Sequence, residues 1–119
     1  MNETERLVEN IVEGIRERKG QNISVADLTG IEDTICKYLV ICQGNSPTQV
    51  EAIKESVEDY VRENTHVKPI GTEGSRNAIW IVMDYADVMV HIFVPDAREF
   101  YDIDHLWEDA IVRQVEDEA

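Results

Sequence analysis

Apolar and polar positions in the N-terminal half of the chain follow the period of a helix and then that of two strands. Over residues 3–19, apolar side chains recur three and four positions apart, which predicts a helix with one buried face that ends near Gly20. A short strand is expected over Asn22–Leu28, with a turn at Thr29–Gly30. The nearly continuous apolar run Tyr38–Cys42 predicts a strand covered on both faces, so we expect it near the centre of a sheet.

A second helix is predicted to begin directly after this strand. Gly44 and Asn45 break the strand, and Ser46 suits the N-cap of a helix. Pro47 suits the first helical position, and Gln49 follows three residues after the cap, as in a capping box. Aliphatic residues at helical spacing mark the buried side of this helix: Val50, Ile53, Val57 and Val61.

The C-terminal half contains the clearest strand pattern. A weak strand is expected over residues 67–70, followed by a polar loop up to Asn77. Apolar and polar side chains then alternate over residues 79–84 and 88–94. Because a turn at Asp84–Asp87 separates the two runs, the pattern predicts a β-hairpin.

After Pro95, the large apolar residues Phe100, Tyr101, Leu106 and Trp107 are spaced like one or two short helical turns and form a candidate binding edge. Residues 103–116 are expected to form a closing helix and residues 110–119 a frayed acidic tail. The order of elements predicts one α/β domain over residues 1–119, with a mixed sheet and flanking helices. The sheet is expected to be parallel across the second helix and antiparallel at the hairpin. No repeat or second domain is indicated.

Charge limits the partners that the chain can bind. Its 119 residues include 25 acidic and 11 basic side chains, which gives a formal net charge of −14. Proteins that bind nucleic acids directly usually present a stripe of Lys and Arg, so direct DNA binding is not expected. An acidic surface can instead be attracted to a basic protein, although solubility or adaptation to a salty or alkaline habitat explains the same charge.

The apolar pattern also bears on location. No apolar run approaches the roughly 20 residues that span a bilayer. Residues 1–20 alternate acidic and basic side chains and lack the apolar block of a secretory signal. We therefore expect a cytoplasmic protein that does not insert into a membrane.

The turn Gly44–Ser46, between a strand and a helix, is a place where nucleotide-binding enzymes hold a phosphate with backbone N–H groups. A nucleotidyltransferase would also need paired carboxylates on a neighbouring strand to hold Mg²⁺. The predicted strands offer no such pair, because Asp84 and Asp87 flank a turn while Asp102 and Asp104 follow the hairpin. The pattern favours a structural turn, and a nucleotide-binding or nucleotidyltransferase-like enzyme is the alternative hypothesis.

The histidines and cysteines give little support to catalysis or metal binding. His91 lies within a predicted strand without a nearby nucleophile, so a structural or interface role is favoured over a general base. His66 and His105 lack the spacing of metal ligands. Cys36 and Cys42 would lie about 20 Å apart along an extended chain, too far for a disulfide, and are expected to be reduced core residues. No catalytic residue, metal or cofactor is assigned.

One face of the hairpin is predicted to carry aromatic and polarizable side chains. Its members are Trp80, Met89, His91 and Phe93, flanked by Asp84, Tyr85 and Asp87 at the turn and by Arg98, Tyr101 and Trp107 beyond it. If a helix covers this face, these residues pack a core. If the face is open, it is a protein-binding site, because Trp, Tyr and Arg concentrate interface energy. Composition alone favours packing.

A longer set of residues carries a resemblance to a known family. The matching positions are Tyr38–Cys42, Gly44, Ser46, Gln49–Val50, Ala52–Ile53, Glu73–Gly74, Trp80, Asp84, Asp87, Val90–His91, Arg98, Phe100–Tyr101 and Leu106–Trp107. In their order and spacing, the sequence resembles the ribosomal silencing factors, also called the Iojap or RsfS family, over roughly residues 5–110.

Two sites depart from the usual family pattern. Ala86 stands in the hairpin turn where the family usually has glycine, and Ile103–Asp104 stand where it has leucine and glutamate. The second change keeps the chemical character of the pair. The first predicts a turn of type I that needs no positive φ, because alanine would be strained there.

The resemblance implies a nucleotidyltransferase-like topology without enzyme activity. It implies a translational repressor that binds the large ribosomal subunit through a basic ribosomal protein, the fourteenth of that subunit, and sterically blocks joining of the small subunit when nutrients are short. We assign to partner binding Glu73, Trp80, Asp84, Tyr85, Asp87, His91, Arg98, Tyr101 and Trp107. A homodimer or adaptor without a ribosomal role, formed through an exposed hairpin edge, is a third hypothesis.

Overall fold

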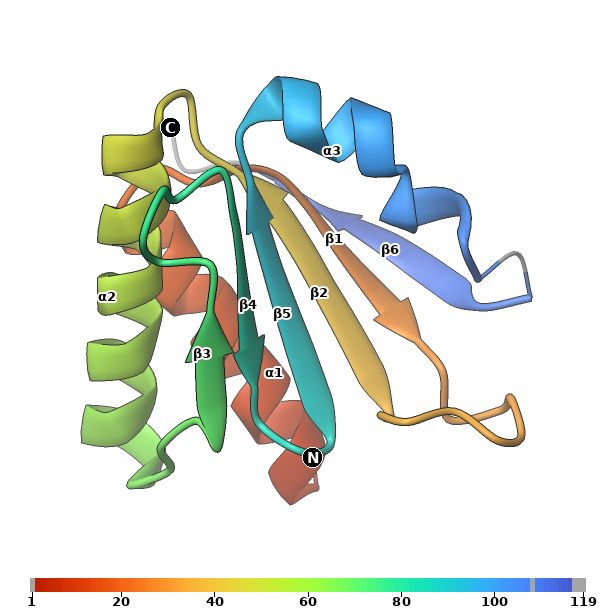
Figure 1. Cartoon of the computed structure of the whole chain (residues 1–119). Coiled ribbons are helices and arrows are strands. Elements are labelled where there is room, and N and C mark those ends of the chain that lie inside the picture. The colour runs from red at the N-terminus through yellow and green to blue at the C-terminus, as the bar shows by residue number, and fades with distance from the viewer. Residues whose placement is uncertain (1, 108, 117–119) are drawn as a thin grey trace.

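The computed structural model describes residues 2–107 and 109–116 and contains a six-stranded mixed sheet with helices on both faces (Figure 1). In chain order the elements are α1 (Glu3–Glu17), β1 (Gln21–Asp27), β2 (Tyr38–Gln43), α2 (Pro47–Thr65), β3 (Gly71–Glu73), β4 (Trp80–Asp84), β5 (Val88–Phe93), α3 (Pro95–Tyr101), the 3₁₀ turn η1 (Ile103–His105) and β6 (Ile111–Val115). The strand order is β3-β4-β5-β2-β1-β6. β2 and β5 are parallel and the other neighbouring pairs are antiparallel. The predicted α/β fold with a mixed sheet is confirmed, and β2 lies inside the sheet as expected.

Both long helices begin at side-chain caps. Asn2 forms a capping box with Glu5, because Asn2 Oδ1 accepts from the backbone N–H of Glu5 at 2.7 Å and Glu5 Oε1 accepts from the backbone N–H of Asn2 at 3.4 Å. Ser46 Oγ accepts from the backbone N–H of Gln49 at 3.2 Å, so the predicted N-cap of α2 is confirmed. The reciprocal bond differs from a capping box, since Gln49 Oε1 accepts from the backbone N–H of Asn45 at 2.7 Å.

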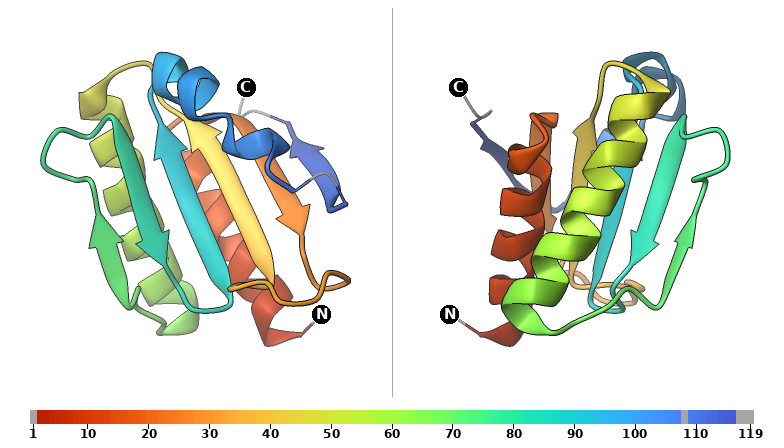
Figure 2. Two further views of the ribbon diagram at one scale, coloured as in Figure 1. Left: turned by 45° about the vertical axis from the view of Figure 1, so that its right-hand side comes forward. Right: turned by 90° about the vertical axis from the view of Figure 1, so that its left-hand side faces the viewer.

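α1 and α2 lie side by side and cover one face of the sheet (Figure 2). Gly14 allows the two helices to approach closely, because a Cβ at this position would lie 2.9 Å from the Cα of Val57. Gln49 Nε2 donates to the carbonyl oxygens of Arg18 and Lys19, each at 3.2 Å. The start of α2 is therefore tied to the end of α1.

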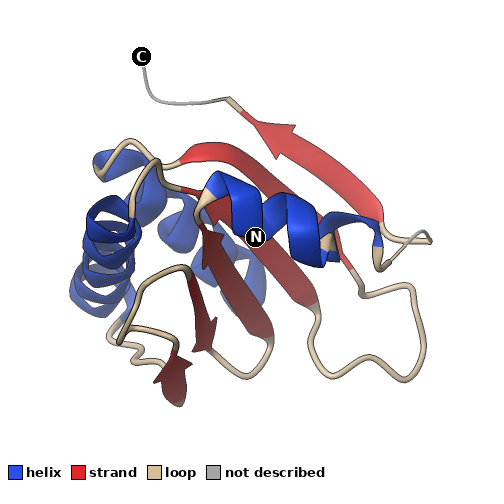
Figure 3. Ribbon diagram, turned by 45° about the horizontal axis from the view of Figure 1, so that its top comes forward, coloured by secondary structure: helices blue, strands red, loops and turns tan. Residues whose placement is uncertain are grey.

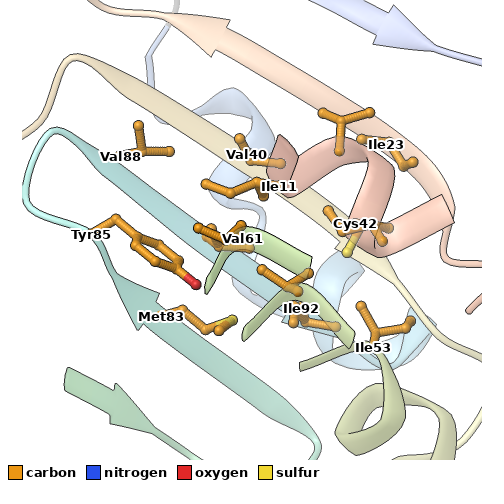
Figure 4. Close-up of a cluster of buried hydrophobic side chains, with 14 of the residues drawn as sticks. Ile11, Ile23, Val40, Cys42, Ile53, Val61, Met83, Tyr85, Val88 and Ile92 are labelled. Carbon is orange, nitrogen blue, oxygen red and sulfur yellow. The ribbon is translucent and has the colours of Figure 1, made fainter. Parts of the chain in front are cut away.

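The larger part of the core lies between these helices and the sheet (Figure 4). Its fully buried side chains are almost all aliphatic and include Ile11, Ile15, Val40, Ile53, Ile81, Met83 and Ile92. They come from the apolar stripe of each helix and from alternate positions of the strands, which explains why periodicity identified these elements. Cys42 is a free, buried thiol in the same cluster.

The opposite face of the sheet is covered only in part. Helix α3 and η1 lie over this face, at the side of β1 and β2 (Figure 3). A smaller apolar cluster is buried there, made of Ala26, Leu28, Cys36, Leu39, Ile41, Phe93 and Ala97. Toward β3, side chains of the same face such as Trp80 and Val82 are only half-buried.

The helix after the hairpin begins earlier than predicted. Pro95 occupies the first turn of α3, where proline pre-sets the helical φ and no N–H bond is needed. The helix ends at Tyr101, because Asp102 takes a left-handed conformation with φ +49°. The predicted helix over residues 103–116 is therefore wrong.

A sixth strand stands in the place of that helix. Residues 111–115 form β6, which pairs antiparallel with β1 from Ile23↔Val115 to Asp27↔Ile111. An apolar spacing of one and three residues fits a helix as well as a strand, and the open edge of β1 selects the strand. Residues 111–115 are thus not a frayed tail, and residues 117–119 of the predicted tail lie outside the described part of the chain.

The weak strand predicted over residues 67–70 is displaced along the chain. The backbone N–H of Ile70 donates to the carbonyl of Asp84 at 2.7 Å, and pairing with β4 then continues through Gly71–Glu73. Pro69 has no N–H to contribute to a ladder, so pairing begins only after it. The prediction placed a strand in the right region but ended it where the real strand starts.

The hairpin turn has a residue with positive φ, which the sequence did not predict. Ala86 has φ +69°, so the prediction of a turn without positive φ is wrong. Three hydrogen bonds hold the turn: Asp84 Oδ1 accepts from the N–H of Ala86 at 2.7 Å, the Asp87 N–H donates to the Tyr85 carbonyl at 2.9 Å, and the Tyr85 N–H donates to the Val88 carbonyl at 2.9 Å. These bonds outweigh the cost of a left-handed alanine, which is about 1 kcal/mol.

Candidate functional site

The candidate site lies on the sheet face that α1 and α2 do not cover. Trp80 and Val82 of β4 point to this face, and their cross-strand partners on β5 are Phe93 and His91. Asp84 is paired in the same way with Met89. Because directly paired residues share a face, the predicted grouping of side chains on one face of the hairpin is confirmed.

Five rings on this face form a continuous group, which we call the aromatic cluster: Trp80, His91, Phe93, Phe100 and Tyr101. The Trp80 ring lies 5.0 Å from that of Phe93 and 4.6 Å from that of Tyr101, and Phe100 meets Tyr101 edge-on at 5.0 Å. Phe93 is fully buried, whereas Tyr101 is 51% and Phe100 80% exposed. The cluster therefore extends from the interior to the solvent.

His91 fixes the orientation of Trp80 inside this cluster. Trp80 Nε1–H donates to His91 Nδ1 at 3.0 Å, which requires that this nitrogen carry no proton. Burial lowers the pKa of His91 from 6.5 to about 4, so the imidazole is neutral at physiological pH. His91 thus acts as a hydrogen-bond acceptor within the cluster.

Carboxylates border the aromatic cluster on the side of β3 and the hairpin turn. Glu73 is exposed on β3, and Asp84 lies at the end of β4. Asp87 is exposed in the turn, where its carboxylate accepts from Thr4 Oγ1 at 3.3 Å and lies 3.8 Å from Lys37 Nζ. We call Glu73, Asp84 and Asp87 the acidic rim.

Three of the residues assigned to partner binding are buried or half-buried within the protein. Tyr85 is 5% exposed and lies on the helix-covered side with Met83 and Val61 (Figure 4), so the expectation that its side chain faces a partner is wrong. Burial raises the pKa of its hydroxyl, which stays protonated. Arg98 is largely buried and bonded within the chain, with 13% of its side chain exposed. Trp107 is half-buried and packs against the smaller apolar cluster.

Two further exposed apolar residues follow the hairpin. Phe100 projects from α3, and Leu106, which follows η1, is 66% exposed. Both belong to the pattern that resembles the family and to the candidate binding edge after the hairpin. The position of α3 over the sheet brings Tyr101 against Trp80 of the hairpin, and Phe100 meets Tyr101 edge-on.

The Gly44–Ser46 turn uses its polar groups within the protein. The Gly44 N–H donates to the Phe93 carbonyl at 2.9 Å, and the Asn45 N–H donates to Gln49 Oε1. A Cβ on Gly44 would lie 3.1 Å from the backbone nitrogen of Val50, so glycine suits the close packing against α2. This turn is built as a helix start, and it gives no support to a phosphate cradle.

The described residues give no support to metal binding or thiol chemistry. No group of three or more His, Cys, Asp or Glu side chains within residues 2–107 and 109–116 is arranged to hold a metal ion. Cys36 and Cys42 are free and buried, as predicted. Burial raises the pKa of both thiols, that of Cys42 to about 12, so neither is a reactive thiolate.

Fold and surface define a small α/β domain with a mixed sheet, one sealed face and one aromatic face bordered by acids. The structure is similar to a crystal structure of a protein from Chromobacterium violaceum, with a TM-score of 0.84 and 29% identity over 90% of this chain and 88% of that one. A crystal structure from Bacillus halodurans has a TM-score of 0.76 and 28% identity, covering 94% of this chain and 98% of that one.

Sequence comparison identifies the family. The family described as "Ribosomal silencing factor during starvation" matches residues 1–119. The chain is 38% identical over 95 residues to the ribosomal silencing factor RsfS of Bacillus subtilis, covering 79% of this chain and 78% of that protein. It is 31% identical over 113 residues to the RsfS of Halalkalibacterium halodurans, covering 94% of each. The chain belongs to the ribosomal silencing factor family, and the resemblance seen in its residues is confirmed. Among the described helices, none combines the length and apolar character of a bilayer span.

Proposed function

We propose that this ribosomal silencing factor represses translation by binding the large ribosomal subunit through a basic ribosomal protein, the fourteenth of that subunit. The bound protein would occupy the face at which the small subunit joins and so prevent association, as under nutrient limitation. Membership of the family supports a role as a silencing factor. The proposal adds the partner, the surface and the steric mechanism, and it places the protein in the cytoplasm.

The observation that carries the proposal is the exposed end of the aromatic cluster, which shares one sheet face with the carboxylates of Glu73 and Asp84. Phe100 and Tyr101 offer apolar area that a partner can desolvate, and buried aromatic side chains dominate the energy of protein interfaces. The rim carboxylates Glu73, Asp84 and Asp87 lie where Lys and Arg of a basic partner would meet them. A formal net charge of −14 would also speed encounter with such a partner.

In this mechanism the protein makes and breaks no covalent bond. His91 on the binding face is a neutral hydrogen-bond acceptor for Trp80, and the two thiols are buried. The effect would depend on how much of the large subunit is occupied and for how long. A nucleotide-dependent activity gains no support from the Gly44–Ser46 turn, and a homodimer stays a prediction.

The test uses isolated ribosomal subunits with a matched pair of variants. Tyr101→Glu places a charge on the exposed part of the cluster, and we expect it to weaken cosedimentation with the large subunit about 30-fold, the effect of losing one interface hot spot. Tyr60→Glu is the control, because Tyr60 lies on α2, which covers the other face. Circular dichroism and thermal unfolding establish that each variant is folded.

Three results would contradict the proposal. The first is that the wild-type protein fails to travel with large subunits in a sucrose gradient or fails to lower their reassociation with small subunits. The second is that Tyr101→Glu binds and blocks as well as the wild type. The third is that Tyr60→Glu loses binding equally, which would move the interface to the helix-covered side.

A further inference from the structure

The most exposed part of the aromatic cluster lies on a short segment that is weakly held by its own structure. The segment consists of α3 and η1, residues 95–105, and carries Phe100 and Tyr101. A helix of seven residues is too short to be stable alone. It is interrupted at Asp102, and in α3 only Ala97 is buried. Contacts outside its own helical hydrogen bonds must therefore hold this segment over the sheet.

Arg98 supplies those contacts from the middle of α3. Its Nε and Nη2 donate to the two carboxylate oxygens of Asp104 at 3.0 and 2.8 Å, which ties α3 to η1. Its Nη1 donates to the Asn22 carbonyl at 2.6 Å and to Gln43 Oε1 at 3.2 Å, and its Nη2 donates to Ser24 Oγ at 3.3 Å. These five bonds equal the number of N–H donors that a guanidinium carries.

The sheet is shaped to receive this guanidinium. The β1–β2 register shifts between Gln21 and Ser24, and Asn22 within this irregular stretch has φ +51°. Its carbonyl accepts from Arg98 in that conformation. Arg98 thus connects α3 with η1, β1 and β2 at once, and its burial means that loss of any partner leaves a charge poorly compensated.

We propose that Arg98 is a positioning residue that pre-organises the α3–η1 segment for docking. It holds Tyr101 against Trp80 and Phe100 at the surface, and it does not itself contact the partner. This inference rests on the proposed function, because the surface it sets in place is the one proposed to bind the large subunit. A rigid surface binds more tightly than a mobile one, since less conformational freedom is lost on association.

The charge of Arg98 allows a positioning role to be distinguished from a direct electrostatic effect on the partner. Replacement of Arg98 by methionine makes an acidic protein more acidic, which by steering alone would favour a basic partner. Positioning predicts the opposite, a loss of binding. Asp104→Asn offers an independent test, because it keeps the shape of the side chain, leaves Arg98 in place and removes the charged partner that anchors it.

The experiment compares Arg98→Met, Asp104→Asn and the double variant, with Arg113→Met as control. Arg113 also forms an ion pair that bridges two elements, to Glu9 of α1, but on the helix-covered side. We expect each single variant to bind large subunits about tenfold more weakly, and the double variant to be no weaker than Arg98→Met, because coupled residues act as one unit. Arg113→Met should bind as the wild type does.

A second readout needs no ribosome. Both tryptophans of the chain report on this segment, because Trp80 contacts Tyr101 and Trp107 follows η1. In the free protein, Arg98→Met and Asp104→Asn should therefore raise the acrylamide quenching of tryptophan fluorescence, while the far-ultraviolet dichroism of α1 and α2 stays unchanged. The Arg113→Met control should leave quenching as it is.

The outcomes distinguish the two proposals. If the wild type does not bind large subunits, the proposed function fails, whereas the quenching result still reports on Arg98. If the wild type binds and Arg98→Met binds equally or more tightly, the positioning role is overturned. The same conclusion follows if Asp104→Asn binds normally while Arg98→Met does not, because Arg98 would then act by direct contact.

Discussion

The two faces of the sheet are built from different kinds of side chain. The face under α1 and α2 is closed by isoleucine, valine and methionine that are almost fully buried, and Tyr85 is its main aromatic residue. The other face combines rings, a histidine and half-buried aliphatic residues, and the short α3–η1 segment and neighbouring loop residues cover only part of it. One face supplies the stability of the domain, and the other keeps large apolar side chains within reach of solvent.

Neighbouring residues of one strand have different roles, because their side chains point to opposite faces of the sheet. Ile81 and Met83 of β4 are fully buried against the helices, while Trp80 and Val82 between them face the aromatic side. Because alternation separates the faces, substitutions on the aromatic side can alter binding without removing the main core. A loss of binding in such a variant therefore reports on the interface and not on unfolding of the core.

The sharpest test of the contrast uses one residue type on each face. Met83→Ala, on the helix-covered face, should lower the free energy of unfolding by about 3 kcal/mol, because it leaves a cavity in a sealed core. Met89→Ala, on the half-open face, should lower it by only about 1 kcal/mol. Urea denaturation measures both. Equal losses would show that the two faces are sealed to the same degree.

Lowering the pH should reduce the free energy of unfolding through protonation of His91 on the aromatic face. The unfolded chain binds a proton at this imidazole below pH 6.5, whereas the folded chain does so only near pH 4, so the stabilising contribution is complete above pH 6.5 and is lost as the pH falls toward 4. The loss amounts to about 3 kcal/mol. It should be absent in His91→Phe, which keeps a ring beside Trp80 and Phe93. Parallel pH profiles of stability for the two proteins would contradict this.

The smallest expected effect lies at the hairpin turn, where β4 passes to β5. Ala86→Gly should raise the free energy of unfolding by about 0.5 kcal/mol, because relief of the left-handed strain exceeds the added freedom of the unfolded chain. Ala52→Gly, within α2, is the matched control and should lower it by about 1 kcal/mol. Destabilisation by Ala86→Gly would show that the turn is not strained.

Elements whose signal is local could be predicted from the sequence. The apolar stripes of α1 and α2, the cap at Ser46 and the alternation in β4 and β5 each reflect which side of an element is buried. β3 and β6 carry no such signal, because β3 has only three residues and β6 pairs with the edge of β1, which is distant in sequence. Pairing of this kind is decided by tertiary contacts, which outweigh local propensity.

The residues of the candidate site divide in the same way, into those with a local sequence signal and those without one. Residues on regular strands, such as Trp80 and His91, could be assigned to one face by counting alternate positions. Tyr85 could not, because it lies in a turn, where alternation ends and the ring crosses to the helix-covered side. The hydrogen bonds of Arg98 could not be predicted either, because they depend on where a short helix packs against β1 and β2.

The parallel pair at the middle of the sheet has a consequence for how the protein is made. Tyr38 of β2 lies beside Val88 of β5, with α2 and the two strands β3 and β4 between them in the chain. During synthesis, β2 must wait for β5 to emerge from the exit tunnel before the sheet can close around it. Until then, β2 can pair only with β1, so a nascent silencing factor carries an apolar strand with one open edge while it is still attached to the ribosome.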